Sequence, residues 1–62
     1  MRSDLDIIAQ WVDPGARVLD LGCGDGTLLA HLAAQRQVAG YGIEIDHDEI
    51  RACIEKGVDV IE

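Results

Sequence analysis

The chain has 62 residues, of which 48% are hydrophobic and 27% charged, and its formal net charge is −7. This length allows one small domain, which buries only about 60% of the surface of its unfolded chain. Contacts to phosphates need clustered Lys and Arg, and the five such residues are scattered, so we expect no nucleic-acid binding. Because no apolar run approaches the ~20 residues that span a membrane, and the acidic N-terminus does not resemble a signal peptide, we expect a cytoplasmic protein without membrane contact.

The first predicted element is a helix over residues 3–12. Ser3 and Asp6 form a capping-box pattern, and an apolar stripe at helical spacing comprises Leu5, Ile7, Ile8, Trp11 and Val12. We expect this stripe to lie against a sheet and Trp11 to be packed in the core or at a domain edge. The Asp-Pro-Gly segment at 13–15 ends the helix.

A strand is predicted over 17–21, where near-continuous apolarity is expected of a central parallel strand covered on both faces. Asp20 interrupts it, and a carboxylate is costly to bury unless it is hydrogen-bonded or meets a positive partner. Two interpretations stay open. Asp20 accepts hydrogen bonds from the loop that follows and only shapes the turn, or it also contacts a ligand.

The loop at 22–26, Gly-Cys-Gly-Asp-Gly, is the feature around which the chain is organised. Its glycines allow positive φ and let a ligand approach the main chain. The helix predicted from Thr27 to about Gln35 offers its N-terminal N–H groups to an anionic group of that ligand. We expect His31 on the exposed side of this helix.

A second strand is predicted over 38–45, and the unit at 18–45 has the length of a βαβ crossover, which implies parallel pairing. Gly40 and Gly42 leave one strand face without side chains, so a helix or ligand can come close. Glu44 ends the strand eighteen positions after the last loop glycine, near the ~20-residue offset at which a carboxylate meets ribose hydroxyls.

Asp46 is expected to cap a third helix, with Glu49 completing a capping box and Gly57 ending the helix. Its buried stripe is predicted to comprise Ile50, Cys53 and Ile54. Helix electrostatics explains the acidic cluster at 46–49 at least as well as metal ligation does, so we predict no metal site. A third strand begins at 58.

The two cysteines, Cys23 and Cys53, belong to no CxxC pair, and no His stands at ligand spacing from them. This pattern suggests neither a zinc site nor a disulfide. We expect both residues to be reduced and partly buried, and no nucleophilic role for Cys23, because no base is evident beside its thiol.

These elements predict an α/β fold, with an N-terminal helix (1–16) followed by a cofactor-binding β-α-β-α-β segment (17–62). This is the first half of a Rossmann-like doubly wound parallel sheet in a three-layer α/β/α arrangement, and we expect residues 1–62 to be the N-terminal part of one domain, truncated early in the third strand. The first strand then lacks a neighbour and apolar faces stay uncovered. We therefore expect the isolated chain to be marginally stable or to self-associate through this edge.

The loop glycines follow a GxGxG pattern, whereas a dinucleotide site has its third glycine at the position that Thr27 occupies. Asp20 adds negative charge beside the loop. This charge does not favour a pyrophosphate, which is itself an anion, but it favours a cofactor with an amino group and a cationic centre. The pattern favours S-adenosylmethionine over NAD.

The segments VLDLGCGDG (18–26) and GIEID (42–46) resemble the first and second motifs of class I S-adenosylmethionine-dependent methyltransferases. The wider pattern, with LDLGCGDGTLLAHL, GYGIEID and ACIEKGVDVI, is similar to the N-terminal third of the MetW family of bacterial methionine-biosynthesis proteins. This resemblance implies a methyltransferase-like fold and homoserine O-acetyltransferase as a partner.

Carried onto this chain, the resemblance implies a set of cofactor-binding residues: Asp20, Gly22, Cys23, Gly24, Gly26, Glu44 and Ile45. In this set Asp20, Gly22 and Gly24 cradle the methionine part, and Gly26 permits close helix packing. Glu44 accepts the ribose hydroxyls and Ile45 packs on the adenine. The family's acceptor pocket lies beyond Glu62, so we expect no catalytic residue here and no activity of this piece alone.

Two functions follow as hypotheses. The whole protein transfers the methyl group of S-adenosylmethionine, leaving S-adenosylhomocysteine, or it is a non-catalytic regulatory partner of homoserine O-acetyltransferase. An NAD-dependent oxidoreductase is disfavoured by Thr27.

Overall fold

The computed structural model describes residues 3–62 without the side chain of Ser3, so the predicted capping role of Ser3 lies outside the described residues. The elements follow the predicted order and are α1 (Ser3–Trp11), β1 (Arg17–Leu21), α2 (Thr27–Arg36), β2 (Ala39–Ile43), α3 (His47–Glu55) and β3 (Asp59–Ile61). None of these helices is long and apolar enough to cross a membrane.

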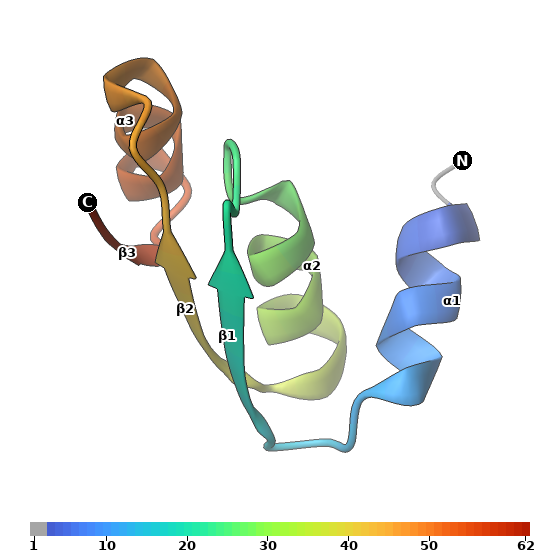
Figure 1. Cartoon of the computed structure of the whole chain (residues 1–62). Coiled ribbons are helices and arrows are strands. Elements are labelled where there is room, and N and C mark those ends of the chain that lie inside the picture. Colours follow the sequence, from blue (N-terminus) through green and yellow to red (C-terminus); the bar gives the residue numbers. More distant parts are fainter. Residues whose placement is uncertain (1–2) are drawn as a thin grey trace.

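The three strands form one parallel sheet in the order β1-β2-β3 (Figure 1). Val18 of β1 is in register with Gly40 of β2, and Gly42 of β2 with Val60 of β3. The predicted β-α-β-α-β path with parallel pairing is therefore confirmed. Within residues 3–62, the outer edge of β1 has no neighbouring strand, as the sequence predicts.

The sheet face that carries Gly40 and Gly42 is the one covered by helices. Leu29 of α2 packs directly on it, and a Cβ added at Gly40 would lie 2.9 Å from Leu29 Cδ2. Two core clusters form on this side: Ala9, Leu32 and Val38, and Cys23, Leu29 and Cys53. The predicted close approach of a helix to the glycine face is confirmed.

Helix α1 packs against α2, whereas the sequence suggested contact with the sheet. Arg36 Nε at the end of α2 donates a hydrogen bond to the Ala9 carbonyl, at 2.9 Å. The expectation that Trp11 is packed is wrong, because its exposed fraction is 76%. Leu5 and Ala9 are one helical turn apart and face inward. Ile7 follows Leu5 by two residues and Trp11 follows Ala9 by two, and a step of two residues turns about 200° around the helix. Ile7 and Trp11 therefore face outward.

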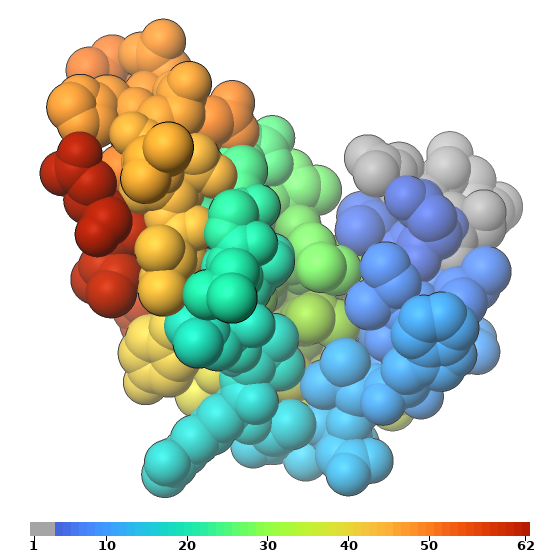
Figure 2. Space-filling model, viewed as in Figure 1, coloured from blue at the N-terminus to red at the C-terminus, as the bar shows by residue number. Residues whose placement is uncertain are grey.

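The opposite sheet face is apolar and uncovered in residues 3–62. Four of its large side chains are at least half exposed, namely Leu19, Leu21, Tyr41 and Ile61, while Ile43 on the same face is partly buried. Figure 2 shows the strands forming the front surface, with α2 behind them. The expectation that β1 is covered on both faces is therefore not met within these residues, because the helices share one side. The expected uncovered apolar face is confirmed.

Candidate functional site

The loop between β1 and α2 uses the conformational freedom of glycine three times. Gly22, Gly24 and Gly26 have φ values of +73°, +59° and +82°, which side chains rarely allow. Asp25 fixes the start of α2, because its Oδ1 accepts hydrogen bonds from the Thr27 hydroxyl (2.7 Å) and the Thr27 amide (3.0 Å). These bonds hold the pKa of Asp25 below its usual value.

Backbone bonds attach this loop to the end of β2. The amides of Gly22 and Cys23 both donate to the Ile43 carbonyl, at 2.7 and 3.2 Å. The loop therefore lies beside the residues that follow Ile43, among them the predicted ribose ligand Glu44.

Glu44 closes the loop onto β2. Its Oε1 accepts a hydrogen bond from the Gly24 amide at 2.8 Å, and its Oε2 accepts from the amides of Asp46 (3.0 Å) and Ile45 (3.1 Å). The amides of Asp46 and Gly24 are the main reason why the pKa of Glu44 is lowered. The structure thus brings together two predicted site residues that stand twenty positions apart in the sequence.

Asp20 takes a different place from the one expected of a residue that only shapes the turn. It is half-buried on the helix-covered face, in register with Gly42, and it accepts none of the bonds donated by the amides of Gly22, Cys23, Gly24 and Gly26. The structure therefore gives no support to the purely turn-shaping interpretation.

The loop and the end of β2 leave open the positions where a ligand is expected. A Cβ added at Gly22 would meet no atom within 4 Å, so the space above this glycine is free. Ile45, the residue after Glu44, has an exposed fraction of 80% and presents an apolar side chain beside the carboxylate. Free space over the main chain, a held carboxylate and an unpacked apolar group fit the predicted cofactor.

Gly26 has a packing role. A Cβ there would lie 3.0 Å from Cys53 Sγ and 3.2 Å from Val58 Cγ2, so only glycine lets α2 begin this close to α3 and β3. This agrees with the close helix packing that the sequence predicts for Gly26.

Cys53 and Lys56, in and just after α3, contact the loop in roles that no sequence pattern predicts. Cys53 Sγ donates to the Gly24 carbonyl at 3.2 Å, and Lys56 Nζ donates to the Asp25 carbonyl at 3.1 Å. Helical periodicity predicts that Cys53 faces inward, but periodicity does not show which residue of another element it contacts. Ile54, predicted in the same buried stripe, is exposed instead.

The two cysteine thiols meet although they are thirty residues apart. Cys23 Sγ lies 3.7 Å from Cys53 Sγ, and both cysteines are free and buried. Burial, followed by the contact with Cys53, raises the pKa of the Cys23 thiol to about 11. A thiol with a raised pKa is mostly protonated near neutral pH, and the protonated form is a poor nucleophile.

Asp46 caps α3 as predicted, because its Oδ1 accepts from the amides of Asp48 (2.9 Å) and Glu49 (3.1 Å). The other half of the capping box is not formed: the Asp46 amide donates to Glu44 rather than to Glu49. The Glu44 carboxylate at the end of β2 therefore also binds the amide of the residue that caps α3.

Both histidines lie away from the loop glycines. His31 was expected on an exposed helix side, but only 20% of its side chain is exposed, because α1 covers it. Its Nε2 lies 3.2 Å from Asp6 Oδ1, without the alignment of a hydrogen bond. His47 is exposed, as expected, and its Nε2 lies 2.8 Å from Glu62 Oε2.

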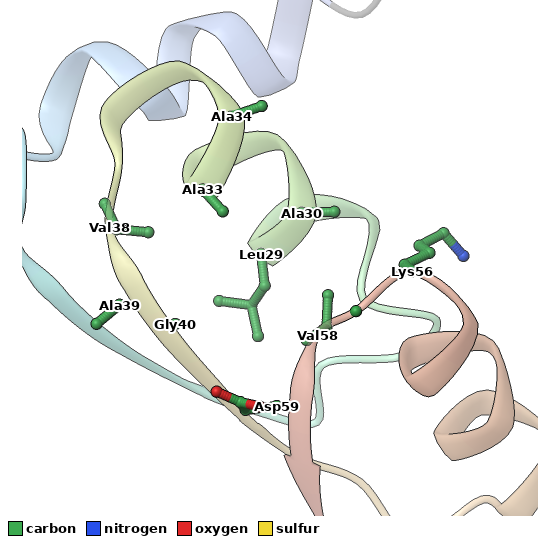
Figure 3. Close-up of a pocket in the computed structure, with 11 residues that line it drawn as sticks. Leu29, Ala30, Ala33, Ala34, Val38, Ala39, Gly40, Lys56, Val58 and Asp59 are labelled. Carbon is green, nitrogen blue, oxygen red and sulfur yellow. The ribbon is translucent and has the colours of Figure 1, made fainter.

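A hollow of about 450 Å³ lies between α2, the start of β2 and the turn into β3 (Figure 3). Small apolar groups such as Ala30, Ala33 and Val38 line it, with Lys56 and Asp59 at its border. None of the predicted cofactor-binding residues lines this hollow, so we do not assign the cofactor to it. Among residues 3–62, no three His, Cys, Asp or Glu side chains converge as metal ligands would.

Comparisons with known proteins support the resemblance stated above. Residues 2–62 match the family described as methionine biosynthesis protein MetW. The chain is 33% identical to the bifunctional methionine biosynthesis protein MetXA/MetW of Rhodopirellula baltica, in an alignment that covers 95% of this chain and 11% of that protein.

Solved structures give the same result for the fold. A methyltransferase from Geobacter sulfurreducens, in complex with S-adenosylhomocysteine, matches with a TM-score of 0.80 at 30% identity, covering all of this chain and 29% of that one. An RNA methyltransferase from Salinibacter ruber, also in complex with S-adenosylhomocysteine, matches with a TM-score of 0.84 at 28% identity, covering all of this chain and 47% of that one.

The chain spans about a tenth of the curated relative and less than half of these two solved structures. The β1-β2-β3 sheet and its helices correspond to the N-terminal half of the Rossmann-like methyltransferase fold, which confirms the predicted fold class. With its family match extending over residues 2–62, the chain belongs to the family of the methionine biosynthesis protein MetW.

Proposed function

We propose that this segment is the binding half-site for S-adenosylmethionine and S-adenosylhomocysteine in a methyltransferase-like protein. The observation that carries the proposal is the Glu44 carboxylate, held 2.8 Å from the Gly24 amide with exposed Ile45 next to it. The complexes of similar solved structures with S-adenosylhomocysteine support the same ligand class.

Each of the predicted residues would contact a different part of the ligand. Glu44 would accept a ribose hydroxyl at the one acceptor site, on Oε1, that its three amide donors leave free, and Ile45 would cover the adenine ring. Gly22 and Gly24 would let the methionine part approach the main chain, with Asp20 and Cys23 completing the loop wall. When bound, S-adenosylmethionine supplies a methyl group on a sulfonium, which is already activated for transfer.

Charge favours a cationic ligand at this end of the sheet. Asp25 lies in the loop, Asp20 and Glu44 flank it, and the whole chain has a formal net charge of −7.

Transfer from a sulfonium depends mainly on proximity and orientation, so this segment is required to bind and orient the ligand rather than to supply a base.

Calorimetry of the intact protein with S-adenosylhomocysteine tests the proposal. We expect Glu44→Gln to lower the affinity at least about tenfold, because a charged acceptor is lost. Glu55→Gln removes an equal charge from an exposed position of α3 and should leave the affinity unchanged. Absence of binding by the unmodified protein at millimolar ligand would refute the proposal.

We also propose that residues 1–62 form the N-terminal part of a larger domain, with the helix and turn at 1–16 preceding the cofactor-binding segment at 17–62. The bare apolar sheet face and the open β1 edge support this, as does the greater length of the similar solved structures. Residues outside this segment would cover that face. Binding of a hydrophobic dye should fall sharply in the longer protein, and equal dye binding by both forms would contradict the idea.

A second function is favoured by the bifunctional MetXA/MetW relative, in which both names belong to one protein. In this alternative the protein is a non-catalytic partner that regulates homoserine O-acetyltransferase. Co-purification of the two proteins, with an altered acetyltransferase rate, would support it. An effect that persists in Glu44→Gln would separate regulation from cofactor binding.

A further inference from the structure

The peptide units around Gly24 are held from two sides by side chains from different elements. The Gly24 amide donates to Glu44 Oε1 at 2.8 Å, and the Gly24 carbonyl accepts from Cys53 Sγ at 3.2 Å. Gly24 has a φ of +59°, a conformation that glycine enters and leaves easily. Contacts on both sides of this residue therefore decide which conformation the loop keeps.

Cys53 contacts the loop from within the core cluster that it forms with Cys23 and Leu29. It is fully buried, with an exposed fraction of 0%, and its sulfur fills the space that Gly26 leaves free. Cys23 Sγ lies 3.7 Å from both Cys53 Sγ and the Gly24 carbonyl, and it packs on Gly42. Two buried thiols thus converge on one carbonyl of the predicted cofactor loop.

We propose that Cys53 is a positioning residue for the cofactor half-site. By fixing the Gly24 carbonyl, it keeps the Gly24 amide directed at Glu44 and so fixes the carboxylate that would accept a ribose hydroxyl. This inference rests on the proposed function and adds a residue of α3 that would not touch the ligand. Loss of the thiol leaves the partly buried Gly24 carbonyl with only the more distant Cys23 thiol as a partner, so the loop relaxes and the carboxylate loses its orientation.

Two variants separate the hydrogen bond from the packing. In the intact protein, Cys53→Ala removes the donor and should lower the affinity for S-adenosylhomocysteine by about threefold to tenfold, the range expected for one neutral hydrogen bond. Cys53→Ser keeps a donor of similar shape and should recover most of the affinity. Ile54→Ala changes the exposed neighbour on α3 and should bind as the unmodified protein does.

Spectroscopy tests the contact independently of any ligand. Infrared spectra should show a thiol S–H stretching band at lower frequency than a free thiol gives, and this band should vanish in Cys53→Ala but persist in Cys23→Ala. Hydrogen exchange of the Gly24 amide should be faster in Cys53→Ala than in Cys53→Ser. Equal exchange in the two variants, or no Cys53-dependent band, would overturn the proposal.

The two proposals fail in different ways. If Glu44→Gln weakens binding while Cys53→Ala binds normally, the positioning role is refuted and the cofactor site stands. If the unmodified protein binds no S-adenosylhomocysteine, the cofactor site is refuted, and with it the role of Cys53 in binding. The spectra then still decide whether Cys53 holds the loop. Should Cys53→Ala not fold, loss of the infrared band in Cys53→Ser and its persistence in Cys23→Ala decide that question.

Discussion

The two faces of the sheet differ in the size of the side chains they carry. The covered face has glycine at positions 40 and 42 of β2, so Leu29 and Cys23 reach the strand backbone. The other face has Leu19, Leu21 and Tyr41 exposed to solvent in residues 3–62. Stability in this chain therefore depends on how closely the elements approach on one face, while the larger apolar groups of the other contribute little.

Truncation of a leucine on each face should give the largest contrast. Leu29→Ala, at a side chain only 2% exposed, should lower the free energy of unfolding by about 3 kcal/mol, through lost burial and a cavity. Leu21→Ala, at a side chain 72% exposed, should cost less than about 0.5 kcal/mol. Urea unfolding of both variants measures the difference, and equal losses would show that the second face is covered in solution.

Adding one methyl group on the covered face should have the next largest effect. Gly42→Ala places a Cβ against the Cys23 side chain, and we expect a loss of about 2 kcal/mol from overpacking. Gly15→Ala is the matched control, because its φ is +76° but no atom lies within 4 Å of the added Cβ, so only the backbone cost of about 1 kcal/mol remains. A smaller loss at Gly42 than at Gly15 would contradict the packing seen on this face.

A charge on the uncovered face should act on association rather than on folding. We expect the 62-residue chain to self-associate through the open β1 edge. Leu21→Lys should shift sedimentation toward the monomer, with little change in the unfolding midpoint. A monomeric unmodified chain with a sharp thermal transition would contradict this expectation.

The smallest effect concerns pH at the rim where β2 ends. Hydrogen bonds lower the pKa of Glu44 in the folded state, so folding gains stability above the ordinary carboxyl pKa of 4.5. That gain is lost as the pH falls from about this value through the lowered pKa. Thermal melts should therefore show a smaller decrease below pH 4.5 in Glu44→Gln, whose amide does not titrate, than in the unmodified chain. Parallel curves would show that these bonds add nothing to the folded state.

Much of the fold was predictable because it depends on short-range signals. The loop glycines, the Asp46 cap and the apolar runs each specify a local conformation, and the βαβ length then leaves parallel pairing as the outcome. The same topology places Glu44 close to the loop, because parallel strands end at the same edge of the sheet.

The wrong predictions concern which side of a helix packs against the rest of the protein. Trp11 and Ile54 carry the most apolar surface of their stretches, yet smaller Ala9 and Cys53 are buried, because the inward direction is set by α2 and the loop. The Cys53 contact with Gly24 was hidden for the same reason: it joins two elements whose relative placement no local pattern encodes.

The strand order has a consequence for how such a chain is made. Within residues 3–62 each strand pairs with the next one along the sequence, so these two pairings need no partner from further along the chain, while the outer edge of β1 stays open. A chain leaving the ribosome can add β2 to β1 and then β3 to β2, each with its helix already on the growing layer. The cofactor loop and Glu44 would then be in place before any later segment is synthesised, so an early ligand could stabilise the nascent chain by mass action.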